Sequence, residues 1–500
     1  MKQWWRAAVA IGAATAVLPA GAASPDRTQS IAWANRLTWG AVPAAAAQVP
    51  GPDRWLDLQL ASTDASLPQP AADQVAAMRI SREPLAQIVV EEEAQNRDSN
   101  AVVDPDQKKI ARDAYQKAMN ALADEARARS LLRDLYASDQ LREQMTWFWF
   151  NHFNVQAGKR DIRAMVGDYE QTIHAHALGR FRDLLEATLR HPAMLRYLDN
   201  DQNAAGRINE NYAREIMELH SLGVGTGYSQ QDVQELARIL TGVGINTKPD
   251  APKLKPQWQP LYVRAGLFEF NPARHDFGDK HFLGHTIKGS GFDEVEQALD
   301  LIAASPATAH HVSLQLATFF TGDAPPSALV DRMAATFQRS HGDIAQVVRT
   351  LARSREFAAS LGGAFKDPVH YAVSAVRLAY GDRVILNSQP VVGWLNRLGE
   401  GLYNHETPDG YPLASASWSG PGQMATRFDV ARQIGGGSAG LFRAAGTPTD
   451  APAFPQLQNA LYFNGLAATL GTPTRTALGQ ATSPQEWNAL FLSSPEFMRR

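Results

Sequence analysis

Helix starts recur along this sequence and limit the folds that it can adopt. A residue that caps helices stands before a proline at Asp104-Pro105, Ser305-Pro306 and Asp367-Pro368. Proline suits the first turn of a helix, because its fixed φ angle is already helical and no N–H is needed there. Apolar residues at helical spacing follow, most clearly over residues 104–135. The pattern predicts a mainly α protein with a large multi-helix body.

One segment departs from this pattern. Residues 249–291 are rich in proline and glycine, and residues 261–270 and 281–287 have strand-like composition. They predict a small β-hairpin insert near residues 255–290. We therefore divide the chain into a leader, residues 1–22, and a single helical unit, residues 23–500. In that unit the insert (249–291) separates an N-terminal helical half (23–248) from a C-terminal half (292–500).

The N-terminus has the layout of a secretory signal. Lys2 and Arg6 precede an apolar run, and Ala20-Gly21-Ala22 is a small-residue cleavage site. We expect cleavage near Ala22 and a periplasmic or secreted protein. No later apolar run reaches the ~18 residues of a membrane helix, so no integral membrane segment is expected after cleavage.

Composition excludes several classes of function. The sequence has no cysteine, which removes disulfides, thiol nucleophiles and thiolate metal sites. Net charge is −3, and loss of Lys2 and Arg6 makes it −3 − 2 = −5. This acidic balance argues against nucleic acid as a partner.

The stretch from Asn209 to Gly223 is predicted to be a helix at the centre of the functional site. Asn211, Arg214, Glu215 and Glu218 share one face, while apolar residues occupy another. Gly223 follows the last expected turn, where a residue with positive φ is favoured.

The charged face has two interpretations. Glu210, Arg214 and Glu218 are spaced four apart, so a solvated row of ion pairs explains them. Alternatively, Glu215 and Glu218 line a cleft, where two carboxylates so close would share a proton or bind a divalent cation. In this interpretation both glutamates are catalytic candidates. Arg214 is a third candidate, whose positive charge would lie beside the two carboxylates.

Histidines join the candidate site from two places. Asn151 and His152 lie within an aromatic run, Trp147 to Phe153, which we expect to be core, with a sugar-stacking platform as the alternative. Buried polar groups need partners, and the carboxylates of Glu215 and Glu218 are plausible ones. His220 is a further proton-transfer candidate, with a structural role at the helix end as the alternative.

Two loops supply the remaining candidates. Residues 271–285 concentrate histidine, aspartate and lysine. His275 and Asp276 are metal-ligand candidates, with Asp279 as the alternative carboxylate and His281 as a further ligand, and Lys280 is a substrate-binding candidate. The alternative is a polar loop that overhangs the helical site. Residues 404–412 form a long turn-rich loop, followed by Trp418. Its length suggests part of a site wall, or else an ordered surface loop. From both loops and the helices, the substrate-binding candidates are Asn151, Asn211, Lys280, Asp409, Tyr411 and Trp418.

Taken together, these motifs resemble the bacterial family catalogued as domain of unknown function 1800. The resemblance spans nearly the whole mature chain. It rests on Asn35-Arg36-Leu37 with Gly40, Trp149 to Phe153, Asn209 to Glu215, Glu218 to Gly223, His275-Asp276 with Lys280, Thr407 to Pro412, and Ser494 to Phe497. Two positions depart from the family pattern: Ser221 replaces a common threonine, and Val243 a frequent tryptophan. The resemblance implies an exported bacterial protein, often encoded beside a sulfatase-like exported protein.

These observations lead to a functional hypothesis. We expect an enzyme that acts on an extracytoplasmic polymer, for which a glycan is the leading candidate. Its carboxylates and histidines would carry out acid/base or cation-assisted chemistry. The alternative is a non-catalytic polymer-binding or scaffold protein that works with the sulfatase-like partner. A carboxylate-bridged metal redox protein is a third option, but the sequence lacks the Glu-x-x-His pairs of such sites.

Overall fold

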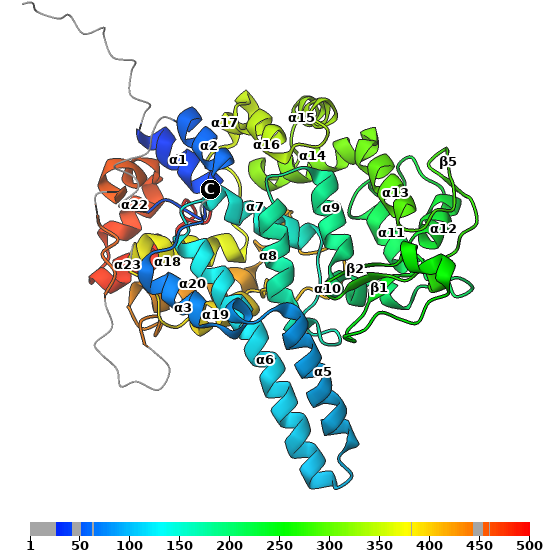
Figure 1. The fold of residues 1–500 in the computed structure, drawn as a ribbon. Helices are drawn as coiled ribbons and strands as arrows, with labels where there is room; N and C mark the ends of the chain where they lie inside the picture. The colour runs from blue at the N-terminus through cyan, green and yellow to red at the C-terminus, as the bar shows by residue number, and fades with distance from the viewer. Residues whose placement is uncertain (1–26, 43–51, 63–64, 382, 444–453, 460) are drawn as a thin grey trace, which may run out of the picture.

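The computed structural model describes residues 27–42, 52–62, 65–381, 383–443, 454–459 and 461–500. Over these residues the chain is mainly α-helical with two small antiparallel sheets, as predicted (Figure 1). The expected signal segment lies outside the described residues. None of the helices described here combines the length and the apolar character needed to cross a membrane.

In the N-terminal half, helices α1, α2, α6 and α8 pack against α7. This helix buries eleven of its thirteen residues, the aromatic run included, which confirms that the run belongs to the core. The helices of this region are α1 (Arg27–Leu37), α2 (Pro52–Ala61), α3 (Gln69–Ala77), α4 (Arg79–Arg82), α7 (Gln140–His152), α8 (Val166–His176), α9 (Phe181–Arg190) and α10 (Pro192–Tyr197).

A helical arm projects from this body. It consists of α5 (Leu85–Ala101) and α6 (Pro105–Tyr136), joined by a short turn at its tip (Figure 1). Asp104 caps α6 as predicted, since its Oδ1 accepts from the Gln107 N–H at 2.9 Å. Towards the tip the arm exposes apolar side chains, with Val103 93% and Ile110 61% accessible.

The central helix is shorter than predicted. α11 spans Asn211–Glu218 and does not continue to Gly223. The chain closes in a tight turn instead: the Ser221 hydroxyl donates to the Ile216 carbonyl at 2.5 Å, and the Gly223 N–H donates to the Met217 carbonyl at 3.2 Å. Gly223 has the expected positive φ, 92°.

A short loop leads from this turn to α12 (Gln230–Ile239). The predicted capping box at its start is formed, because Ser229 and Asp232 each bond the other's main chain.

The predicted β insert is present, but its first sheet also includes a strand that lies before the predicted segment. β1 (Val243–Ile245), which precedes the predicted insert, pairs with β3 (Phe268–Phe270), and β3 pairs with β2 (Val263–Ala265). A second hairpin consists of β4 (Lys280–Phe282) and β5 (His285–Ile287). Val243 joins the sheet opposite Phe270 and is fully buried.

The C-terminal half is again helical. Ser305 and Asp367 cap their helices as predicted. Buried apolar side chains form one connected cluster from Ile31 to Met498, so the two halves share a core. The helices are α13 (Phe292–Ala304), α14 (Pro306–Thr321), α15 (Ser327–Arg339), α16 (Ile344–Ala352), α17 (Arg355–Ser360), α18 (Pro368–Tyr380), α19 (Gln389–Arg397), α20 (Pro421–Gly435), α21 (Ala467–Thr469), α22 (Thr472–Gly479) and α23 (Pro484–Leu492), with a π-helical turn at Tyr462–Leu466.

Candidate functional site

Acidic side chains of α11 and of the loop 404–411 lie together. Glu215 is half-buried on α11, and burial raises its pKa; the neighbouring carboxylates of Glu218 and Asp409 add to the rise, which Arg214 opposes. Among the described residues, no hydrogen bond to the Glu215 carboxylate is formed. Glu215 is therefore easier to protonate than an ordinary glutamate.

Glu218 has a different environment on the same helix. The Arg214 guanidinium pairs with Glu218 at 3.1 Å and with Glu210 at 3.1 Å, and it also donates to Gln230 at 2.9 Å. The predicted row of ion pairs is thus formed. Because Glu215 lies outside this row, the two candidate carboxylates differ: one is paired with a cation and the other is not.

Tyr197 adds a residue that the sequence did not point to. Its hydroxyl donates to the Glu406 carbonyl at 2.8 Å. Burial raises its pKa, and the carboxylates of Asp409, Glu215 and Glu406 raise it further. Tyr197 therefore lies between α11 and the loop, a position that no spacing in the sequence indicates.

The end of α7 holds the loop in place. The Asn151 amide donates to the Tyr411 carbonyl at 2.9 Å, and its oxygen accepts from the Tyr411 N–H at 2.6 Å. The Asn154 amide donates to the carbonyls of His405 and Thr407 at 3.1 and 2.8 Å. Gly410 has φ 71°, and a Cβ there would lie 2.1 Å from the Asn151 carbonyl oxygen, so only glycine fits.

The predicted substrate-binding residues divide into supports and exposed groups. Tyr411 donates its hydroxyl to the Gly401 carbonyl at 2.9 Å, and the buried Trp418 donates its indole N–H to the Pro412 carbonyl at 2.9 Å. With Asn151, these residues stabilise the loop. Asn211 and Asp409 are exposed and lie on the solvent side of the acidic cluster.

Three histidines lie beneath the turn that follows α11. The His152 Nε2–H donates to the His220 carbonyl at 3.0 Å, and the His311 Nε2–H donates to the Leu219 carbonyl at 3.2 Å. The His152 ring lies 6.1 Å from each of the other two, centroid to centroid. Burial, followed by the proximity of His311, lowers the pKa of His152 to about 3, and burial lowers that of His220 well below its ordinary value. Both rings are therefore neutral at pH 7.

These contacts correct the expected partners. Asn151 and His152 bond main-chain groups of Tyr411 and His220, and not the carboxylates of Glu215 and Glu218. His220 is buried after the end of α11, and among the described residues neither of its ring nitrogens has a hydrogen-bond partner.

The neutral histidines predict a loss of stability in acid. An unfolded histidine titrates near 6.5, whereas folded His152 titrates at about 3, so the unfolded chain binds protons first as the pH falls. The free energy of unfolding should decline from about pH 6.5 and continue to fall towards pH 3. We expect a lower urea midpoint at about pH 5 than at about pH 7. His152→Gln should reduce the difference between the urea midpoints at these two pH values, and the exposed control His310→Gln should leave it unchanged. The same difference in both variants would contradict the assignment to His152.

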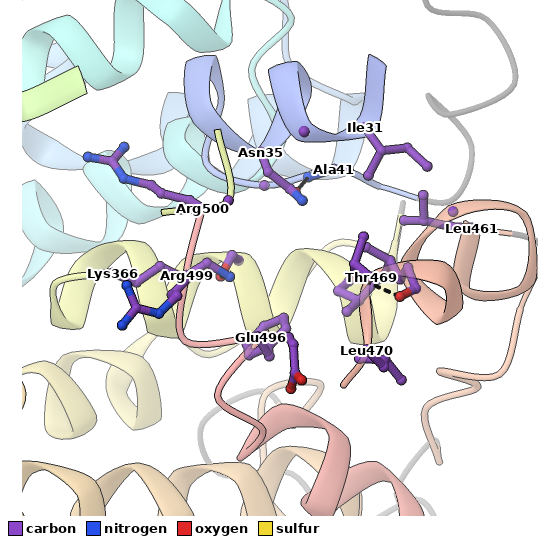
Figure 2. Close-up of a pocket in the computed structure, with 18 of the residues that line it drawn as sticks. Ile31, Asn35, Ala41, Lys366, Leu461, Thr469, Leu470, Glu496, Arg499 and Arg500 are labelled. Atoms are coloured by element: carbon purple, nitrogen blue, oxygen red, sulfur yellow. Dashed lines mark hydrogen bonds between the residues drawn. The ribbon is translucent and has the colours of Figure 1, made fainter. Parts of the chain in front are cut away.

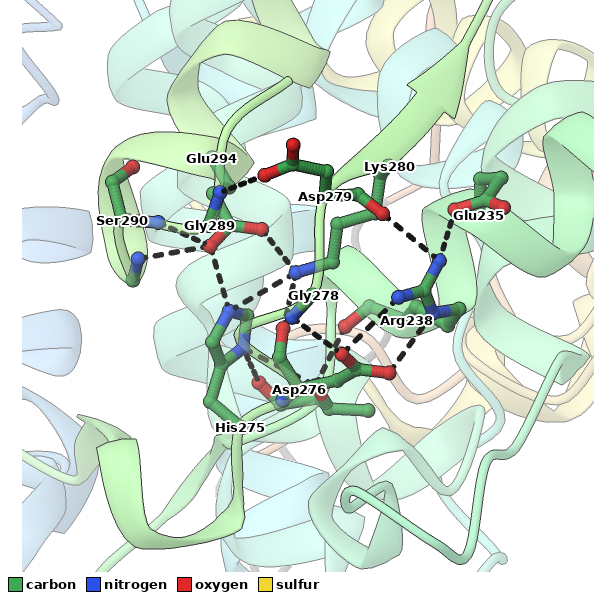
Figure 3. Close-up of polar contacts among 12 residues, drawn as sticks. Glu235, Arg238, His275, Asp276, Gly278, Asp279, Lys280, Gly289, Ser290 and Glu294 are labelled. Atoms are coloured by element: carbon green, nitrogen blue, oxygen red, sulfur yellow. Dashed lines mark hydrogen bonds and ion pairs between the residues drawn. The ribbon is translucent and has the colours of Figure 1, made fainter. Parts of the chain in front are cut away.

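The metal candidates His275 and Asp276 lie in a separate network (Figure 3). His275 Nδ1 faces the Thr241 carbonyl at 2.7 Å, and Nε2 faces the Glu294 carboxylate at 2.9 Å. Both ring nitrogens of His275 therefore have partners within the protein. The Arg238 guanidinium holds Asp276, with Nε 2.9 Å from Oδ2. The network joins α12 to the β4–β5 hairpin and α13.

Lys280 belongs to the same network and not to a substrate site. Its side chain and that of Glu294 have no exposed surface, and the two form an ion pair. The Lys280 ammonium also donates to the Asp276 carbonyl. Although burial itself raises the pKa of Glu294, hydrogen bonds from His275 and Lys280 outweigh it and lower that pKa. Lys280 is thus a structural cation.

A cavity of about 280 Å³ lies elsewhere, between α1, α18 and the C-terminal segment (Figure 2). Its lining is mostly apolar, with Lys366 at one side. The Lys366 Nζ donates to Ser374 Oγ at 3.0 Å and lies 3.8 Å from the centroid of the Phe497 ring. None of the candidate residues discussed above lines this cavity.

Comparison with known proteins places the chain in a family. It matches the family model described as "Protein of unknown function (DUF1800)" over residues 32–499. No curated protein and no solved structure matches the chain. Because the matched region runs from α1 to the end of the C-terminal segment and includes every candidate residue, the chain belongs to the DUF1800 family.

Proposed function

We propose that this protein is an exported enzyme that acts on an extracytoplasmic polymer, with a glycan as the first candidate, and that Glu215 transfers the proton. The observation that carries the proposal is the contrast between Glu215 and Glu218. The first is half-buried with a raised pKa and no hydrogen bond among the described residues, and the second is paired with Arg214. Burial raises the pKa of Glu215 towards the range that suits a general acid, which is the role that we assign to it.

The neighbouring residues have supporting roles in this proposal. Asp409 and Asn211 offer exposed polar groups to the polymer, and Arg214 holds Glu218 in an ion pair. His152 holds the turn after α11 through its bond to the His220 carbonyl, so we assign His152 to positioning and not to proton transfer. The buried His220 ring is neutral at pH 7, and we assign it no proton transfer either. One helical turn between the two glutamates suits proton exchange within one site, and it fits elimination as well as hydrolysis.

The test uses a panel of acidic and neutral surface polysaccharides. Reducing ends report hydrolysis, and ultraviolet absorbance of an unsaturated product reports elimination. Glu215→Gln should lower the turnover of an accepted polymer by ~10²-fold or more. The control Glu210→Gln, which removes a carboxylate at the start of the same helix and from the same ion-pair row, should leave turnover within about twofold. Full turnover by a folded Glu215→Gln variant would refute the assignment.

The alternative is a non-catalytic binding or scaffold protein that works with a sulfatase-like exported partner. The projecting α5–α6 arm favours it, because the arm carries accessible apolar side chains at Val103 and Ile110 away from the body. A binder should retain its affinity for the polymer or the partner in Glu215→Gln and lose it in Val103→Asp. An enzyme should lose turnover in Glu215→Gln and keep it in Val103→Asp.

A further inference from the structure

A second cluster of ionisable side chains lies inside the protein, between α7 and α8. Asp139 precedes α7, Glu143 belongs to its first turn, and His174 belongs to the last turn of α8. All three side chains are buried, and one potential ligand atom from each lies within 4.8 Å of the others. Among the described residues, this is the one group of at least three such side chains that converges so closely.

Asp139 is the unusual member of this cluster. It has no exposed surface, yet among the described residues neither of its carboxylate oxygens accepts a hydrogen bond. Its nearest cation is Arg142, whose Nε lies 3.3 Å from Oδ2, while the rest of that guanidinium donates to the carbonyls of His174 and Ser62. A buried carboxylate without hydrogen bonds is costly, so a bound cation at this position would stabilise its charged form.

The charged groups around the cluster also favour a bound cation. Asp134 and Glu170 are also buried nearby, so four carboxylates share this region. Burial raises the pKa of Asp134 well above its ordinary value, and the proximity of Glu143 and Glu170 adds to the rise, so a further positive charge in this region would be stabilised.

The geometry of the donors favours a cation. His174 Nε2 lies 3.0 Å from a Glu143 oxygen, and both atoms converge on the region of the free Asp139 oxygens. One imidazole nitrogen with two carboxylates is a donor set that Zn²⁺, Mn²⁺ and Fe²⁺ accept, whereas Mg²⁺ and Ca²⁺ prefer oxygen alone. We propose that Asp139, Glu143 and His174 bind one divalent transition-metal ion, which ties the start of α7 to the end of α8.

This site is independent of the proposed chemistry at Glu215. It lies at the opposite end of α7 from Asn151 and His152, the residues that contact the loop 404–411 and the turn after α11. Because all three ligand side chains are buried, the ion would have a structural role and would be inaccessible to substrate.

The test measures metal in the intact protein. Protein purified without chelator is analysed by inductively coupled plasma mass spectrometry, and chelator-treated protein is titrated with Zn²⁺, Mn²⁺ and Co²⁺. We expect about one equivalent per chain, d–d bands of bound Co²⁺ with N/O ligands, and a higher unfolding temperature on addition of metal. Asp139→Asn should lower the affinity at least ~10-fold.

A matched control is available one turn along α8. Glu170 is also buried and also has one oxygen without a hydrogen-bond partner among the described residues, but it lies outside the converging group. Glu170→Gln should keep the wild-type affinity. If Asp139→Asn does not fold, His174→Gln takes its place, and the Co²⁺ spectrum of the wild type remains decisive. Absence of binding by all three ions, or equal affinity in the ligand variants, would overturn the proposal.

Discussion

Replacing Lys280 by methionine should lower the free energy of unfolding by about 3–5 kcal/mol. The substitution keeps the length of the side chain but leaves the buried Glu294 carboxylate without its cation, and the Asp276 carbonyl without a donor. Removing one partner of a buried ion pair is far more costly than removing an exposed pair, because the remaining charge has no water to solvate it. Urea unfolding at pH 7 measures the effect.

The hairpin itself supplies the control. Lys288 pairs with Asp279, but its side chain is 77% exposed. Lys288→Met should change the free energy of unfolding by at most about 1 kcal/mol. The double variant Lys280→Met/Glu294→Gln should recover part of the loss, since no net charge is left buried. A Lys280→Met protein as stable as the wild type would show that the network does not contribute to folding.

The destabilisation caused by Lys280→Met should depend on pH, because it acts through the Glu294 carboxylate. The pKa of Glu294 is lower in the folded protein than its ordinary value, so its contribution is fully present above the ordinary glutamate range. It is lost as the pH falls through the folded pKa. The difference between wild type and Lys280→Met should therefore be largest near neutrality and shrink in acid.

Arg36→Met should destabilise the protein by about 3–5 kcal/mol. The Arg36 side chain is completely buried and donates to the carbonyls of Phe320, Ser360 and Arg500, with Nη2 2.6 Å from the Ser360 oxygen. It thereby joins α1 to the ends of α14 and α17 and to the C-terminal segment. Methionine fills the space but leaves these carbonyls without donors. Thermal and urea unfolding measure the loss.

An exposed arginine on the next helix serves as the comparison. Arg54 lies on the surface of α2, and Arg54→Met should stay within about 0.5 kcal/mol of the wild type. Arg36→Lys should recover only part of the stability, because an ammonium cannot reproduce the planar fork of donors. Equal stability of Arg36→Met and Arg54→Met would contradict this account.

Local features of the fold could be predicted from the sequence. The cap at Asp104, the capping box at Ser229 and the ion pairs of Arg214 depend on residues three or four positions apart. Such interactions are set by helix geometry, whatever the rest of the chain does. The same geometry did not predict the early end of α11, where Ser221 turns the chain through its own hydroxyl.

The partners of buried polar groups could not be predicted. Asn151 and Tyr411 are 260 positions apart, and Arg36 and Arg500 are 464 apart. Helical periodicity shows which side of a helix is buried but not which segment covers it. For this reason Lys280 and Tyr411 were expected to contact substrate, whereas their polar atoms bond the protein itself. The Asp139 cluster could not be predicted either, because its residues come from the start of α7 and the end of α8, about 30 positions apart, and no local spacing relates them.

The α5–α6 arm also affects how the protein moves through water. With 32 residues, α6 alone is roughly 48 Å long, and much of that length extends beyond the body. An elongated particle experiences more friction than a sphere of equal mass. Gel filtration calibrated with spherical standards will therefore overestimate the size of a single chain, and the number of chains per particle should be taken from light scattering or sedimentation equilibrium.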